Sequence, residues 1–241
     1  NILAIEYIKA VYNLGLNMKP VTIQRFGSGH DQMSGEGYKS AAEIRRMMIS
    51  GRDIAAVLPE SAYAVYKREE KLGRGPVVPE SLESAVISRL RMLPDEAYER
   101  LPDAGEGLHN RVAKAAREEC SVDAILAAGK SKRYALSRIR RMVMCAALGI
   151  SADMADETPP YARVLAASVR GCELLHNMRQ TARKPIIIKP ADVKNCGDDC
   201  RKLFELGSGA HDLYVLGYAA RGERRGGSDW RTSPKIIAEN G

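Results

Sequence analysis

The chain has 241 residues, with 37 Lys and Arg against 30 Asp and Glu and a formal net charge of +7. Hydrophobic residues make up 45% and charged residues 28%, which is typical of a soluble globular protein and too apolar for a disordered one. No apolar run reaches the roughly 20 residues needed to cross a bilayer, so the composition excludes a membrane-spanning protein.

The first residues predict a helix followed by a strand. Apolar residues recur at close to 3.6-residue spacing over 2–14, which predicts an amphipathic helix. Asn1 is suited to cap its start and Gly15 to end it. The stretch 21–26 then alternates apolar and polar residues, as strands do.

A glycine-rich loop over 27–37 comes next and contains His30. Ser40 and Glu43 then have the spacing of a capping box, which predicts the start of a helix. The order helix, strand, loop, helix is typical of the end of an α/β unit. Because the loop precedes a helix start that bears Arg45, we predict a phosphate site there. A turn followed by an ordinary cap is the other interpretation, and it is the more common one for a glycine-rich loop before a helix.

From residue 59 onward the pattern is mostly helical, and Gly and Pro separate the segments. A short apolar run over 185–189 predicts a buried strand or an extended crossing. The chain is therefore predicted to be mostly α, with an α/β edge over 1–58 and a helical domain over 59–241. Its helices are predicted over 60–72, 81–92, 106–119, 122–129, 132–148, 169–182 and 210–219.

Positive charge concentrates between residues 107 and 150, where nine basic residues stand against three acids. Such clusters beside an aromatic residue are typical of contacts with a nucleic-acid backbone, although most charge runs are solvated helix faces. The predicted nucleic-acid-binding residues are Lys130, Lys132, Arg133, Tyr134, Arg138 and Arg141.

Other residues with chemical potential are more isolated. Trp230, the only tryptophan, follows three arginines and is either a stacking platform for a base or, more often in such positions, a packing residue. His109, His176 and His211 lie on predicted helices without a partner at useful spacing. The five cysteines predict reduced thiols in a cytoplasmic protein, and although Cys196 and Cys200 are four residues apart, no metal site is predicted.

Several short runs resemble one bacterial family, the tRNA(Met) cytidine acetate ligases. They occur in the order of the family and span nearly the whole chain. The runs are N-I-L-A-I-E-Y-I-K-A over 1–10, K-P-V-T-I-Q-R-F-G over 19–27, S-A-A-E-I-R over 40–45, E-G-L-H-N-R over 106–111, K-S-K-R-Y over 130–134, T-A-R-K-P-I over 181–186 and G-G-S-D over 226–229.

The resemblance implies the C-terminal edge of a nucleotidyltransferase-like, Rossmann-like α/β domain, followed by a basic helical domain that binds tRNA. It also implies that ATP, with Mg²⁺, activates acetate as an acetyl-adenylate, which then acetylates the wobble cytidine of elongator tRNA(Met). The residues that match ATP-binding positions are Asn1, Arg25, Ser40 and Arg45.

Two departures from the family keep an alternative open. Ala42 stands where the family has Thr, and no H-x-G-H run occurs in the chain. We therefore expect a fragment that lacks the N-terminal half of the ligase and is inactive by itself. The alternative is an RNA-binding module without catalysis, whose nucleotide site has decayed. A nucleotidyltransferase that makes a small cofactor ranks last, because it would not need so large a basic domain.

Overall fold

The computed structural model describes residues 2–24, 39–156 and 158–238. Its contacts divide the chain into two compact units, Asn1–Tyr63 and Ala64–Gly241. Most described residues are helical, and the strands are short. This confirms the predicted mostly α fold class. The expected domain boundary, between residues 58 and 59, lies close to the division between the units.

The first unit contains α1 (Ile2–Asn13), α2 (Ala41–Ile49), a 3₁₀ turn (Ala55–Val57) and the start of α3 (Glu60–Lys71). Helix α1 follows the predicted bounds and buries none of its residues. Gly15, with φ of +61°, lies just after it in the left-handed region that favours glycine.

Helix α2 begins as its sequence predicts. The hydroxyl of Ser40 accepts a hydrogen bond from the backbone N–H of Glu43 at 3.2 Å, which is the hydroxyl half of the predicted capping box. The Glu43 carboxylate accepts one from Lys39 Nζ at 2.8 Å. The prediction of a strand over 21–26 is wrong for the residues that the structure describes, because residues 21–24 form no strand. A strand needs a neighbour to satisfy its backbone, and the described part of this unit supplies none.

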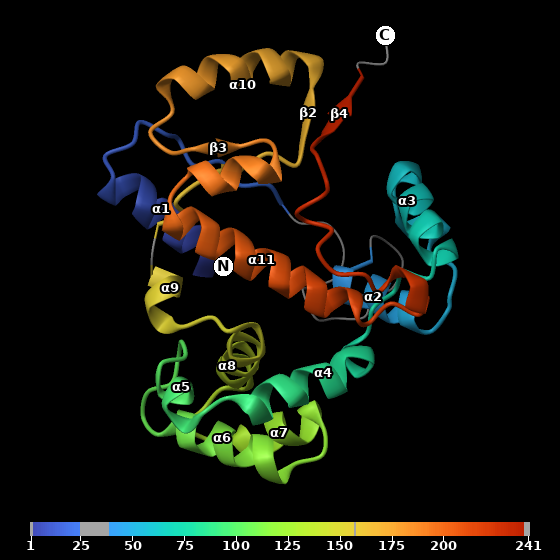
Figure 1. The fold of residues 1–241 in the computed structure, drawn as a ribbon, viewed down its shortest axis with the longest axis vertical. Coiled ribbons are helices and arrows are strands. Elements are labelled where there is room, and N and C mark those ends of the chain that lie inside the picture. Colours follow the sequence, from blue (N-terminus) through green and yellow to red (C-terminus); the bar gives the residue numbers. More distant parts are fainter. Residues whose placement is uncertain (1, 25–38, 157, 239–241) are drawn as a thin grey trace. The chain divides into compact units, whose positions relative to one another are not determined.

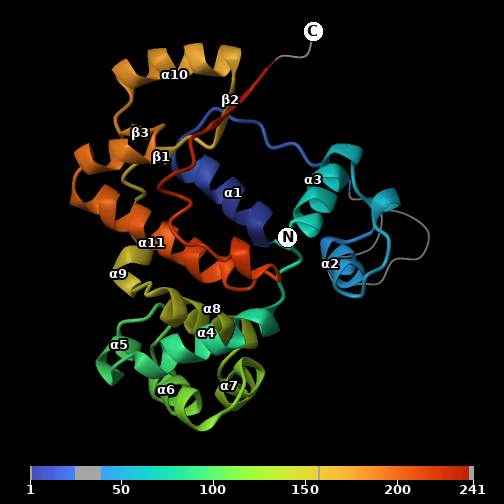
Figure 2. The same cartoon turned by 45° about the vertical axis from the view of Figure 1, so that its right-hand side comes forward.

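In the second unit, helices α4 (Pro79–Met92), α5 (Asp95–Glu99), α6 (Leu108–Glu118), α7 (Val122–Gly129) and α8 (Leu136–Leu148) surround the larger core. Figures 1 and 2 show α4 beside α8, with α6 and α7 against them. Helices α7 and α8 approach closely at Gly129, where a Cβ atom would lie 3.0 Å from the side chain of Ile139. The fully buried side chains of the larger core include Leu90, Leu108, Val112, Ile125, Ile139 and Met142.

The rest of the second unit combines two small parallel sheets with two helices, α10 (Val169–Thr181) and α11 (Asp198–Val215), and a short one, α9 (Ala152–Asp156). In one sheet, β1 (Ala162–Arg163) pairs with β3 (Ile186–Ile187). In the other, β2 (Ala166–Ser168) pairs with β4 (Lys235–Ile237), and α10 follows β2 directly (Figure 1). Two 3₁₀ turns, Pro190–Asn195 and Arg221–Glu223, complete the unit.

A smaller core lies under these sheets. Its buried members are Ile187, Val193 and Phe204, and Tyr161 and Trp230 pack against them. The apolar run predicted as a buried strand therefore reaches the core as β3, although the strand is shorter than predicted.

Two predicted helices differ in their bounds. The helix expected over 132–148 begins only at Leu136, because Ser131–Ala135 form a turn in which the Ser131 hydroxyl accepts a hydrogen bond from the N–H of Arg133. The helix expected over 210–219 is α11, which begins much earlier, at Asp198. Gly207 and Gly209 weaken its sequence signal, but burial of Phe204 and Ser208 on one face supports the helix.

Among the helices of the described residues, none has both the length and the apolar composition that a bilayer span requires.

Candidate nucleotide and nucleic-acid sites

The predicted nucleotide site centres on the start of α2. The side chain of Ser40, which caps α2, is buried. Arg45 lies one turn further along the helix and is exposed. The first backbone amides of a helix and its partial positive charge favour an anion at this end. Asn1, Arg25 and His30 lie outside the described residues, so their part in this site stays a prediction.

Arg138 is the most engaged residue of the basic segment. Its side chain is 25% exposed and lies against the turn between α5 and α6. Nε and Nη2 donate to the carbonyl of Asp103 at 3.2 and 3.0 Å, Nη2 also reaches the carbonyl of Gly105 at 3.3 Å, and Nη1 donates to the Glu106 carboxylate at 3.2 Å. Arg138 therefore holds this turn in place.

Two further arginines of the segment pair with acids of the same turn. Arg141 Nη2 lies 2.8 Å from the Asp103 carboxylate, and Arg133 Nε lies 3.5 Å from that of Glu106. A hydrogen bond from Arg138 and the charge of Arg133 hold the pKa of Glu106 below its usual range. Asp103 and Glu106 precede the basic segment of residues 107–150, and they reduce the positive charge of its surface.

Tyr134 is buried rather than exposed at the surface. Its ring is 8% exposed, and its hydroxyl donates a hydrogen bond to the carbonyl of Glu106. The guanidinium carbons of Arg133 and Arg138 lie 5.9 and 5.5 Å from the ring centroid, within the range of cation–π attraction. The ring belongs to the larger core, and both arginines lie close to it. Its predicted role at a nucleic acid stays a prediction.

Other cations of the segment remain open to solvent. Lys130, Lys132 and Arg140 are exposed, and none forms an ion pair with an acid in the part of the chain that the structure describes. Among the residues predicted to bind nucleic acid, Lys130 and Lys132 thus carry the least compensated charge.

Trp230, directly after the G-G-S-D run, packs against the smaller core. Trp230 packs edge-on against Phe204, with ring centroids 4.5 Å apart, which confirms the packing interpretation of this tryptophan. Asp229 forms an ion pair with Arg163 at 2.7 Å, and its carboxylate lies 2.8 Å from Nδ1 of His211. Burial favours the neutral form of Asp229, but its hydrogen bonds to Arg163 and His211 prevail and lower its pKa.

His211 corrects one expectation, because it does have a partner. The Asp229 carboxylate and the Ser228 hydroxyl, at 3.0 Å, both meet its Nδ1 atom. Both partners come from one of the runs that resemble the family, and helix spacing alone could not reveal a contact with so distant a segment.

Among the described residues, no further side chains lie beside Cys196 and Cys200 that could complete a metal site. Cys196 Sγ donates to the carbonyl of Asp192 at 3.1 Å, and Cys200 is buried. Within residues 2–24, 39–156 and 158–238, no three His, Cys, Asp or Glu side chains are placed to hold a metal ion.

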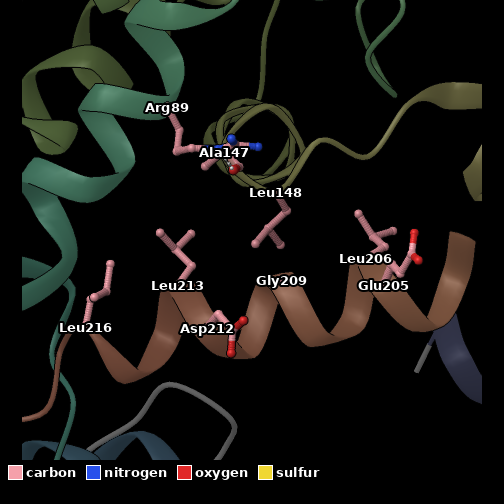
Figure 3. A pocket seen from close by; sticks show the side chains of 9 residues that line it. All are labelled: Arg89, Ala147, Leu148, Glu205, Leu206, Gly209, Asp212, Leu213 and Leu216. Atoms are coloured by element: carbon pink, nitrogen blue, oxygen red, sulfur yellow. Dashed lines mark hydrogen bonds between the residues drawn. The ribbon is translucent and has the colours of Figure 1, made fainter. Parts of the chain in front are cut away.

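A groove of about 480 Å³ runs between α8 and α11. In Figure 3, Leu206 and Leu213 point from α11 toward Leu148 of α8. Nε of Arg89 donates a hydrogen bond to the carbonyl of Ala147 at 3.1 Å. The lining is largely apolar and includes two carboxylates, so it does not favour an anionic nucleotide. The lining residues are Arg89, Ala147, Leu148, Glu205, Leu206, Gly209, Asp212, Leu213 and Leu216.

Comparison with known proteins gives consistent matches along the chain. The sequence profile of the HIGH Nucleotidyl Transferase family matches residues 1–229. The tRNA(Met) cytidine acetate ligase of Syntrophomonas wolfei subsp. wolfei is 30% identical over an alignment of 246 positions, which covers 97% of this chain and 59% of the relative. The ligase of Thermosipho africanus is 31% identical and covers 98% of this chain and 60% of the relative.

Solved structures agree with these matches. The crystal structure of apo Thermotoga maritima TmcAL matches with a TM-score of 0.87 at 27% identity, over 98% of this chain and 60% of that one. A second structure of TmcAL, bound with alpha-thio ATP, matches with a TM-score of 0.84 at 26% identity, over 98% of this chain and 59% of that one. The chain thus spans about 60% of the length of the relatives it matches.

Proposed function

The chain belongs to the HIGH nucleotidyl transferase family, and from this membership we propose that it acts in an ATP-dependent acetate ligase. The product is N4-acetylcytidine at the wobble position of elongator tRNA(Met), formed in the cytoplasm. The observation that carries this proposal is similarity to tRNA(Met) cytidine acetate ligases along 97% of the chain.

The proposed chemistry has two steps. Acetate is a poor electrophile, so a carboxylate oxygen first attacks the α-phosphorus of ATP, and pyrophosphate leaves. The N4 amine of cytidine then attacks the acyl carbon of the acetyl-adenylate, AMP leaves, and the amine loses a proton. Positive groups near the phosphates stabilise the charge that develops on them in the first step.

The residues divide between these tasks. We assign Asn1 and Arg25 to ATP through the family resemblance, and Ser40 and Arg45 to its phosphates because they lie at the start of α2. Mg²⁺ accompanies ATP, as it does where phosphates are bound with few protein ligands. The exposed cations near Lys132 are assigned to the phosphate backbone of the tRNA.

The test of the ligase function is transfer of labelled acetate to elongator tRNA(Met) in the presence of ATP. It compares this chain with a longer protein that adds the part of a relative that the chain does not span. We expect label in the tRNA only with the longer protein. If both proteins bind tRNA and neither transfers label, the chain is a non-catalytic RNA-binding module.

Lys132→Ala is expected to weaken tRNA binding about five- to tenfold, because an exposed cation without an acidic partner releases counterions fully when it meets a phosphate. The slope of log K against log salt should fall by about 0.9, the contribution of one phosphate contact. Fluorescence anisotropy of labelled tRNA over a salt series measures both.

The matched control is Arg133→Ala, which should have a smaller effect because Glu106 already pairs with Arg133 at 3.5 Å. Equal affinities and slopes for the wild-type chain and Lys132→Ala would remove Lys132 from the RNA surface.

A further inference from the structure

A second pocket, of about 340 Å³, lies in the second unit between α11 and the segment that carries the G-G-S-D run. We propose that it binds the phosphate group of a nucleotide unit, in an RNA chain or in a free nucleotide. Its polar lining groups are three arginines, a histidine and two hydroxyls, together with two glutamates. They are Arg74, Arg225, Arg231, His211, Ser228, Thr232, Glu69 and Glu223.

The negative charges of this pocket are already compensated. Arg74 Nη2 lies 2.6 Å from the Glu223 carboxylate, and its Nη1 lies 3.5 Å from that of Glu69. Glu69 has a second partner, since Arg68 Nη2 lies 2.7 Å from its other oxygen. Neither glutamate is therefore left to neutralise the remaining cations of the pocket.

Arg225 and Arg231 are those remaining cations. Both are exposed, and neither forms an ion pair with any of the described residues. Arg231 Nη2 donates to the carbonyl of Gly226 at 2.7 Å, which fixes its position over the loop while leaving its charge uncompensated. Two guanidinium groups beside a concave surface match the geometry and charge of a phosphate.

The loop that presents these groups is held against α11 by Asp212. The N–H of Gly227 donates to Asp212 at 2.6 Å, and φ of +75° at this residue lies in the left-handed region that favours glycine. At Gly226, a Cβ atom would lie 3.0 Å from the Asp212 carboxyl carbon. The glycine pair thus lets the loop seat directly on Asp212, and a preformed loop reduces the entropy lost when a ligand binds.

The remaining lining suits the rest of a nucleotide. Asp229 meets Nδ1 of His211, and in the part of the chain that the structure describes no residue bonds to the other ring nitrogen, which leaves it available to a ligand. Tyr218 and Val215 add an aromatic and an apolar wall, on which a base or sugar can pack. The pocket is at the lower end of the size range of small-molecule sites, which fits a single nucleotide unit.

The test uses the whole chain and the fluorescence of Trp230, which is the only tryptophan and adjoins Arg231. The chain is titrated separately with a short single-stranded RNA, with ATP and with inorganic phosphate. Arg225→Gln should weaken the saturable response about fivefold and lower its salt slope by about 0.7, the contribution of one single-strand phosphate. Arg221→Gln, an exposed arginine of the same segment that does not line the pocket, is the matched control and should leave both unchanged.

The arms of the test distinguish the sources of the phosphate. A response to RNA that depends on Arg225, without one to ATP, assigns the pocket to a phosphodiester chain. A response to ATP that depends on Arg225 assigns it to a free nucleotide. Equal effects of the Arg225 and Arg221 substitutions, or no response of the wild-type chain to any ligand, would overturn the proposal. Retention of the Arg225-dependent response in Lys132→Ala, in which tRNA binding is weakened, separates this pocket from the tRNA surface proposed above.

Discussion

Phe204→Ala should lower the free energy of unfolding by about 3–5 kcal/mol, the usual loss for a buried aromatic residue replaced by alanine. Phe204 is 1% exposed and belongs to the smaller core. One side of its ring meets Trp230, and the Arg163 guanidinium carbon lies 4.7 Å from its centroid. The substitution would remove both contacts and leave a cavity beneath the C-terminal loop.

Chemical denaturation followed by Trp230 fluorescence measures this loss, because the tryptophan reports on the same contact. Tyr214→Ala is the matched control, since Tyr214 is an aromatic residue of the same helix that is 46% exposed. It should cost less than about 1 kcal/mol. Similar losses for the two variants would show that the smaller core contributes little to stability.

Arg138→Ala should lower the free energy of unfolding by about 2–3 kcal/mol. Its guanidinium makes several hydrogen bonds to one turn, and bonds from a charged donor contribute more than neutral ones. That turn contains two residues other than glycine in the left-handed region, Asp103 and Glu106, both with φ of 64°. Arg138→Ala would remove hydrogen bonds that offset the strain of this conformation, while the contacts of Arg141 with Asp103 and of Tyr134 with Glu106 would remain.

The same denaturation experiment on Arg140→Ala gives the control. Arg140 lies two residues away on α8, is exposed, and should change stability by no more than about 0.5 kcal/mol. Arg138→Lys separates charge from shape, because lysine keeps the charge but loses the planar fork of donors. Full stability in Arg138→Lys would contradict the assigned role of the fork.

The sequence predicted those elements whose signals are local. Helices α1, α4, α7 and α10 lie close to their predicted bounds, because apolar periodicity and caps are properties of neighbouring residues. Strands β1 and β2, at two and three residues, are too short to carry a period, and each is defined only by its partner.

The candidate sites show the same limit. The start of α2 could be predicted because Ser40 acts on an amide three residues away. The acids that face the basic segment could not, because Asp103 and Glu106 lie on a preceding turn that only the tertiary fold brings to α8. The partners of His211 required the folded position of the G-G-S-D run for the same reason.

The two small sheets differ in when they can form. Strand β1 meets β3 after β2 and α10 have intervened, whereas β2 must wait for β4, near the far end of the described chain. During synthesis, β1 and β3 can therefore pair while the ribosome is still adding residues, and β2 keeps an unpaired edge until β4 has emerged. Because distant pairings form slowly, closure of the β2–β4 sheet is expected to be a late step of folding.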